Sequence, residues 1–139
     1  MFFSPSPVKL SKAVAAVRIV VGLLLIYHGK EVFDSELMNG YMAWDNFKSL
    51  TGKIMVYAGK SAELVAGILL ALGLYTRISA VLIIGTFLYI TFLVGHGRFW
   101  YEDQHPFLFA LFGVLFFFTG PGAWSLDALR MKEAHQHVV

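Results

Sequence analysis

The sequence predicts an all-α integral membrane protein, a four-helix bundle with a short interfacial helix between spans one and two. Two observations support this class. Of the 139 residues, 58% are hydrophobic and only 14% are charged, whereas soluble domains contain about 25% charged residues. Residues 78–95 and 106–126 also contain no charged side chain. Because about 20 mainly apolar residues can cross a bilayer as a helix, each stretch is long enough to be a span.

Four spans are expected, at about residues 12–30, 54–75, 77–96 and 105–124. They leave no room for a separate soluble domain, so residues 1–139 are interpreted as one membrane domain. Gly120-Pro121-Gly122 should end the last span, because proline lacks a backbone donor and glycine tolerates turn geometry. Ser125 is then placed to cap a short helix that carries Asp127 in its first turn.

The loop between the first two expected spans predicts the interfacial helix. Leu37, Tyr41, Trp44 and Phe47 are spaced i, i+4, i+7 and i+10, which places them on one helical face. Tryptophan and tyrosine favour the headgroup level of a bilayer. Such a helix either anchors the bundle or forms a lid over a site, and the sequence leaves both open.

Charge predicts the orientation and limits the partners. With four spans both termini lie on one side, and that side has more lysine and arginine than aspartate and glutamate. The positive-inside rule therefore predicts that both termini are cytoplasmic. The net charge of +2 is too small to indicate a nucleic-acid partner. The chain has no cysteine, which excludes thiol redox chemistry and iron–sulfur ligation by its own residues.

Three sequence segments resemble the DoxX family of small bacterial four-helix membrane proteins: HGK at 28–30, SAELVAGILLALGLYTR at 61–77 and GPGAWSLDALR at 120–130. The resemblance covers about residues 13–130. It implies a multi-pass protein of the bacterial cytoplasmic (inner) membrane. It also implies association with redox systems, because the name-giving member is linked to a thiosulfate:quinone oxidoreductase or terminal oxidase. Glu31, directly after the Gly-Lys pair, has no place in the family pattern.

Charged groups within the expected spans indicate the candidate site. Such groups are costly in a bilayer and usually face the protein interior. Glu63 lies deep in span two, Lys60 lies one turn away, and His28 lies near the outer end of span one. Side chains lean toward the N-terminus of their helix, so His28 and Lys60 are favoured over Arg18 as partners of Glu63. Arg18 is close enough to the start of span one to reach the headgroups instead.

Other polar groups are expected at the same outer half of the bundle. The ligand-binding candidates are Glu63, Lys60, His28, His96, His105 and Tyr57. They form a hydrated bundle mouth, a pocket for a small molecule or quinone head, or a metal site. No metal is predicted, because no tight histidine–carboxylate ligand motif is present. Arg18 and Arg77 are assigned to structure or charge pairing. The row Gly59–Glu63–Gly67 is interpreted mainly as a close helix contact.

Three functions remain open from the sequence. The leading one is a membrane subunit associated with a redox enzyme or the quinone pool, with redox-enzyme subunits as partners. The second is a small transporter or proton-coupled carrier in which Glu63 titrates. The third is a non-catalytic membrane scaffold. The chain has no haem, iron–sulfur or nucleotide motif and no self-contained catalytic motif, so its cofactor, enzymatic activity and homo-oligomerisation stay open.

Overall fold

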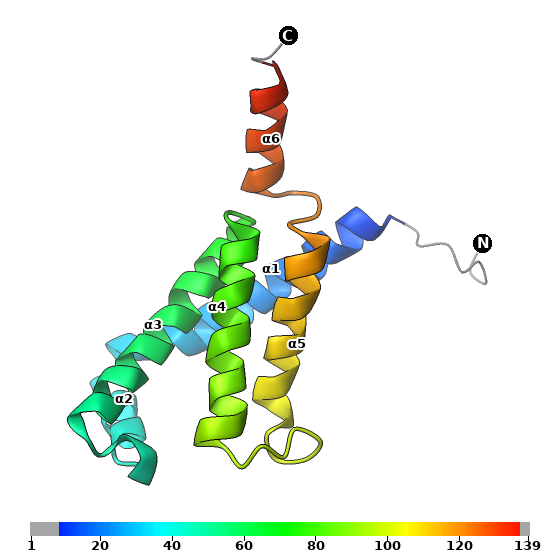
Figure 1. Ribbon diagram of the computed structural model, residues 1–139. Helices are drawn as coiled ribbons and strands as arrows, with labels where there is room; N and C mark the ends of the chain where they lie inside the picture. Colours follow the sequence, from blue (N-terminus) through cyan, green and yellow to red (C-terminus); the bar gives the residue numbers. More distant parts are fainter. Residues whose placement is uncertain (1–8, 137–139) are drawn as a thin grey trace.

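The computed structural model describes residues 9–136, and the regular structure in this range is entirely helical. This confirms the predicted all-α class. Residues 1–8 and 137–139, at the two ends of the expected membrane domain, lie outside the described part. Figure 1 labels six α-helices: α1 (Leu10–Gly29), α2 (Ser35–Met42), α3 (Leu50–Leu72), α4 (Thr76–Tyr89), α5 (Gln104–Thr119) and α6 (Leu126–Gln136).

Three helical segments are long and apolar enough to cross a membrane: Leu10–Phe33, Leu50–Leu72 and Thr76–Val94. The first continues α1 through a 3₁₀ turn, and the third continues α4 through a π-helical turn. The fourth expected span, 105–124, is too long, because α5 ends at Thr119. Gly120 follows with φ 72°, and Pro121 cannot continue the helix. Sixteen residues give a helix of about 24 Å, shorter than the bilayer core of about 30 Å.

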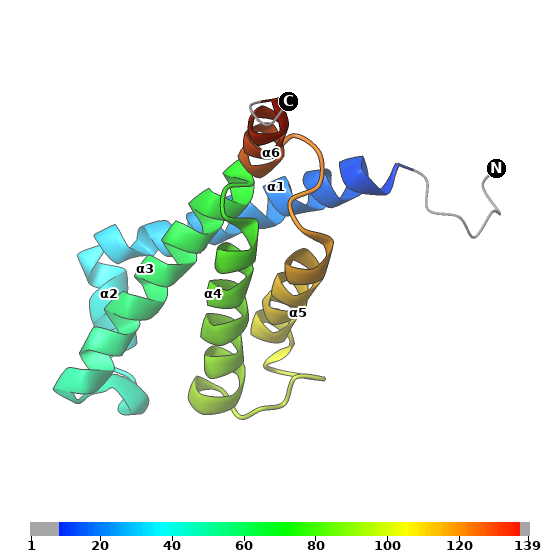
Figure 2. The same cartoon turned by 45° about the horizontal axis from the view of Figure 1, so that its top comes forward.

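The helices pack in chain order, α1 on α3, α3 on α4 and α4 on α5. In Figures 1 and 2, α1 crosses the other three obliquely. We call one end of the molecule the α2 end, because α2 and the α4–α5 loop lie there, and the opposite end the α6 end (Figure 1). The shared core includes Leu25, Leu70, Ile83 and Phe116. Outward-facing apolar side chains such as Val65 and Ile78 are 48% and 58% exposed, as expected of helices that face lipid.

Glycines allow α1 and α3 to approach closely. A Cβ atom on Gly67 would lie 2.8 Å from the backbone nitrogen of Ile26, and one on Gly22 would lie 2.6 Å from that of Ala71. These distances are too short for any side chain, so both positions require glycine. The prediction that Gly59 belongs to this contact is wrong. A Cβ atom there would meet nothing within 4 Å, because α1 ends at Gly29, which packs against Leu64, more than one turn before Gly59.

The short helix between spans one and two exists, but its predicted single face does not. α2 ends at Met42, and Trp44 has extended backbone, with ψ 146°. The chain then turns through a separate 3₁₀ segment, Asp45–Phe47. Leu37 is 45% exposed, while Met38 is fully buried and packs in a small second core with Phe47 and Val56. Trp44 and Phe47 therefore do not lie on the same helix as Leu37 and Tyr41.

Arg18 holds the α6 end together, in line with its assignment to structure, and does not reach the headgroups, which was the alternative. Its side chain is fully buried, and its guanidinium donates hydrogen bonds to backbone carbonyls of α3 and of the α5–α6 loop. These acceptors are the carbonyls of Leu70, Ala71, Pro121, Ala123 and Trp124. The last carbonyls of a helix have no intrahelical partner. Arg18 satisfies two of them on α3, and a side chain that snorkels to the surface could not.

Asp127 and Ser125 determine how α6 begins. Ser125 Oγ accepts the N–H of Ala128 at 3.2 Å, which confirms the expected cap. Asp127 lies in the first turn of α6 and also binds the start of α4. Its carboxylate accepts the N–H groups of Tyr75 and Thr76 at 2.9 and 3.0 Å. Partial burial alone would raise the pKa of Asp127, but these two bonds and the Thr76 hydroxyl hold it below its ordinary value.

Candidate functional site

Lys60 lies between two carboxylates in the half of the molecule toward the α2 end. Its Nζ is 3.1 Å from Oε2 of Glu63 and 2.9 Å from Oε2 of Glu31. The side chains of Lys60, Glu63 and Glu31 are 14%, 5% and 17% exposed. A lysine ammonium has three donors, and these contacts use two of them. Among the described residues, no further hydrogen-bond acceptor of Lys60 occurs.

The three groups come from two helical segments. Lys60 and Glu63 are at positions i and i+3 of α3, so they share a face of that helix. Glu31 lies in the 3₁₀ turn that continues α1, Lys30–Phe33. Its hydrogen bond from the Tyr41 hydroxyl, at 2.7 Å, ties α2 to the same point. We call Glu31, Lys60 and Glu63, with Tyr41, the charge cluster.

Tyr41 contributes both a donor and a ring to the charge cluster. Lys60 Nζ lies 4.9 Å from the centre of the Tyr41 ring, within cation–π distance. Burial, and next the hydrogen bond to the Glu31 carboxylate, raise the pKa of Tyr41 above its ordinary value. The phenol therefore stays protonated at neutral pH and remains a hydrogen-bond donor to Glu31.

A cavity of about 190 Å³ adjoins the charge cluster, between α3, α4 and the α2–α3 connection. Lys60 and Glu63 supply its charged wall, and aromatic side chains supply much of the remainder. The lining residues are Tyr41, Trp44, Phe47, Met55, Val56, Gly59, Lys60, Glu63, Thr86, Tyr89, Ile90 and Val94. Trp44 and Met55 are 52% and 38% exposed, so the cavity is open to the outside. Gly59 thus leaves room in the cavity and makes no helix contact.

The helix that forms the α4 side of the cavity has an irregular backbone there. α4 changes into a π-helical turn at Ile90–Val94, and both of these end residues line the cavity. Single π turns inside α-helices are frequent at functional sites. Here the turn also frees the carbonyl of Val94, which accepts a hydrogen bond from Asn46 at 3.2 Å. This bond links α4 to the α2–α3 connection that covers the cavity.

The other expected site residues do not all meet at the charge cluster. His28 pairs with Glu31 at 3.8 Å and, among the described residues, forms no direct ion pair with Glu63, so their predicted partnership stays a prediction. Its ring lies 5.9 Å from that of His105, which is exposed. Tyr57 is 45% exposed and does not line the cavity. His96 is in the α4–α5 loop, apart from the others.

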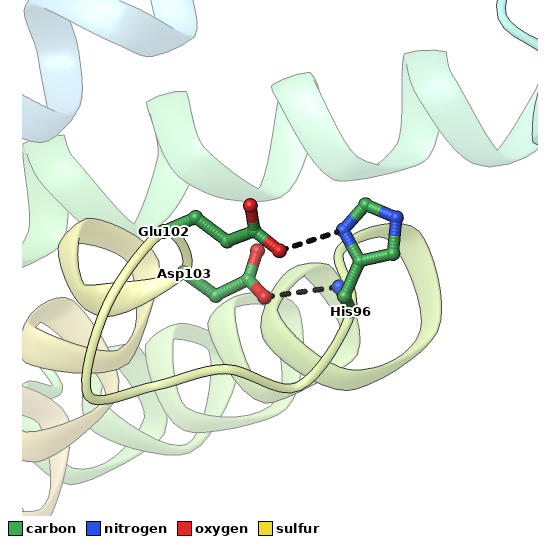
Figure 3. A group of neighbouring side chains, drawn as sticks. All are labelled: His96, Glu102 and Asp103. Carbon is green, nitrogen blue, oxygen red and sulfur yellow. Dashed lines mark hydrogen bonds and ion pairs between the residues drawn. The ribbon is translucent and has the colours of Figure 1, made fainter.

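His96, Glu102 and Asp103 form a second polar group, shown in Figure 3. Each offers a ligand atom within 4.8 Å of the others. The Asp103 carboxylate already accepts the backbone N–H groups of His96 and Arg98, both at 2.9 Å. His96 Nδ1 lies 3.1 Å from Glu102 on the surface. These bonds hold the α4–α5 loop in shape, which is a sufficient role for the group.

Arg77 was expected to be structural or paired with an acid. It is exposed, and no ion pair of Arg77 occurs within residues 9–136. It lines a different cavity at the α6 end.

Glu31 is the residue of the charge cluster that sequence reasoning missed. One signal was present, because Glu31 follows His28 at i+3 near the outer end of span one and is therefore close to that expected site residue. The family pattern gave Glu31 no role, and the sequence could not show that a 3₁₀ turn extends the first helix past Gly29.

Comparison with known proteins supplies the family. The model of the DoxX family matches residues 13–96, more than half of the chain. The chain belongs to the DoxX family. No curated protein and no solved structure matches it. Together with the three long apolar helices, this makes the chain a DoxX-like integral membrane protein. The matched segment contains most of α1, all of α2 to α4 and the charge cluster, whereas α5 and the expected motif at 120–130 lie beyond it.

Proposed function

We propose that this DoxX-family protein binds the head of a quinone in the cavity beside Lys60 and Glu63, as a membrane subunit associated with a redox enzyme. One observation carries the proposal: an aromatic-lined cavity has a partly buried lysine in its wall, and carboxylates use only two of its three donors. Ligand pockets are mainly apolar and contain a few polar groups that fix orientation. A quinone matches both features, because its ring is flat and its carbonyl oxygens accept hydrogen bonds.

The charge cluster also suits the protons of quinone chemistry. Reduction of a quinone to a quinol takes two electrons and two protons. The chain has no cysteine, so a partner redox subunit has to exchange the electrons. Glu63 and Glu31 flank Lys60, and intramembrane carboxylates commonly relay protons.

Quenching of Trp44 fluorescence by a short-chain quinone tests the proposal. Trp44 lines the cavity, and the other two tryptophans, Trp100 and Trp124, are exposed and can be changed to phenylalanine. The full chain in mild detergent should show saturable quenching. Glu63→Gln removes the carboxylate that holds the Lys60 ammonium in the cavity wall. It should weaken binding by about tenfold or more, since hydrogen bonds to charged groups contribute about 1.5–3 kcal/mol.

Glu36→Gln is the matched control, because Glu36 is an exposed carboxylate of α2 outside the cavity. Its binding curve should match that of the unchanged protein. Quenching that rises linearly with quinone in every variant reflects partition into the micelle and would contradict the proposal.

A proton-coupled carrier is the second candidate, because two carboxylates share one ammonium group. In proteoliposomes with a trapped pH dye, proton flux that depends on Glu63 without quinone binding would favour the carrier. A scaffold predicts neither result.

A further inference from the structure

A second cavity, of about 660 Å³, lies at the α6 end. It is formed by the start of α4, the end of α5 and the first turns of α6, at the opposite end of the molecule from α2 (Figure 1). The charge cluster does not contribute to it. Its lining residues are Tyr75, Thr76, Arg77, Ile78, Thr119, Gly120, Pro121, Asp127, Arg130, Met131 and Ala134.

The cavity presents two guanidinium groups from different helices, Arg77 of α4 and Arg130 of α6. The Arg130 guanidinium is held over the ring of Tyr75, 4.9 Å from its centre. Asp127 is the one acidic residue in the lining, and its carboxylate is already bonded to Tyr75 and Thr76. The lining thus has a net charge of +1, with donors available to an anion.

The same cavity continues onto the apolar surface of the spans. Ile78 lies inside the segment Thr76–Val94 and is 58% exposed, and Met131 is 59% exposed. A ligand that matches this surface has an anionic head and apolar chains. Free phosphate would use only the head.

We propose that this cavity binds the phosphate group of an anionic phospholipid, with the acyl chains along the exposed apolar surface at Ile78. Guanidinium groups match phosphate geometry, and basic pockets between helices at the membrane surface bind anionic headgroups. The bound phosphate bridges Arg77 and Arg130. It therefore fixes α6 against α4, although α6 otherwise extends away from the bundle (Figure 1).

Native mass spectrometry of the full chain in mild detergent tests this site. The probes are dioleoyl phosphatidylglycerol, which is anionic, and dioleoyl phosphatidylethanolamine, which has the same chains and no net charge. The unchanged protein should retain phosphatidylglycerol preferentially. Arg77→Gln with Arg130→Gln should weaken that binding by about 30-fold, since each surface charge is worth about fivefold.

Arg98→Gln is the matched control, because Arg98 is an exposed arginine in the α4–α5 loop at the other end. Its phosphatidylglycerol binding should not change. A melting curve in detergent without added lipid should change little for the double variant, because both arginines are exposed and the surface contact of Arg130 with Tyr75 is worth only about 0.5–1 kcal/mol. If the double variant binds phosphatidylglycerol as well as the control, or if both lipids bind equally, the proposal is wrong. Displacement of the lipid by millimolar inorganic phosphate would show an ion site and also overturn it.

Discussion

Arg18 shows how a single charged side chain can organise one end of a membrane protein. The guanidinium has five N–H donors in a fixed planar arrangement, and five backbone carbonyls surround it. Two belong to the end of α3 and three to the loop before α6. Gly73 makes this possible, because a Cβ atom there would lie 2.8 Å from the Arg18 guanidinium. The residue thus closes α3 and positions the loop at once.

Replacement of Arg18 by methionine should therefore destabilise the protein strongly. Methionine keeps much of the apolar stem but leaves several buried carbonyls without a donor. The loss of hydrogen bonds from a charged donor, at about 1.5–3 kcal/mol each, predicts a total of at least about 3 kcal/mol. Thermal unfolding in detergent measures the effect, with Arg98→Met as the exposed control. Similar melting temperatures for the two variants would show that the carbonyl contacts contribute little.

At the scale of elements, the α1–α3 contact depends on glycine at some positions and not at others. Gly67→Ala should lower stability by about 1–3 kcal/mol, because its methyl group would overlap the backbone of α1. Gly59→Ala should be neutral or stabilising, since alanine favours a helix by about 1 kcal/mol and the space is open. Melting curves of the two variants, recorded under identical conditions, decide this. Equal losses at both positions would mean that the space seen around Gly59 and Gly67 does not decide whether alanine is tolerated.

The connection between α4 and α6 should depend on pH through Asp127. A carboxyl group with a lowered pKa in the folded state stabilises the protein fully above its unfolded pKa, near 3.9, and loses that contribution as the pH falls through the lower folded value. Asp127→Ala should therefore cost about 1 kcal/mol at pH 7, as the loss of a helix cap does.

The same measurement near pH 3 and below separates this effect from packing. The difference in melting temperature between Asp127→Ala and the unchanged protein should shrink as the pH falls. Glu133→Ala, an exposed acid on the same helix, should show a small difference at every pH. A difference for Asp127→Ala that is constant from pH 7 to pH 2.5 would contradict a role for its ionised carboxylate.

At the scale of the whole molecule, the orientation in the membrane remains a prediction from charge. The chain has no cysteine, so single cysteines report without background. Ser35 and Gln104 are exposed near the α2 end, and Ser11 and Ala134 are exposed near the α6 end. An impermeant thiol reagent applied to intact bacterial cells should label cysteine at the first pair only. Labelling of the second pair alone would show that the orientation is opposite to the predicted one.

The sequence by itself determined the class of this protein and the places where its helices run. Apolar composition and uncharged runs predict membrane helices, because a helix that crosses the bilayer needs about 20 consecutive residues that are mainly apolar. Lys60 and Glu63 were paired correctly for the same local reason, since residues three apart share a helical face. The Ser125 cap and the break at Gly120 likewise depend only on near neighbours.

Only the tertiary structure decided which turns of different helices meet. Glu31 reaches Lys60, Arg18 binds the α5–α6 loop, and Asp127 binds the start of α4, each across at least 29 residues of sequence. The crossing of α1 over α3 also leaves Gly67 packed and Gly59 open. Helical periodicity fixes the face on which a residue lies, but it carries no information about the tilt and separation of two helices. Those depend on the sum of all side-chain contacts between them.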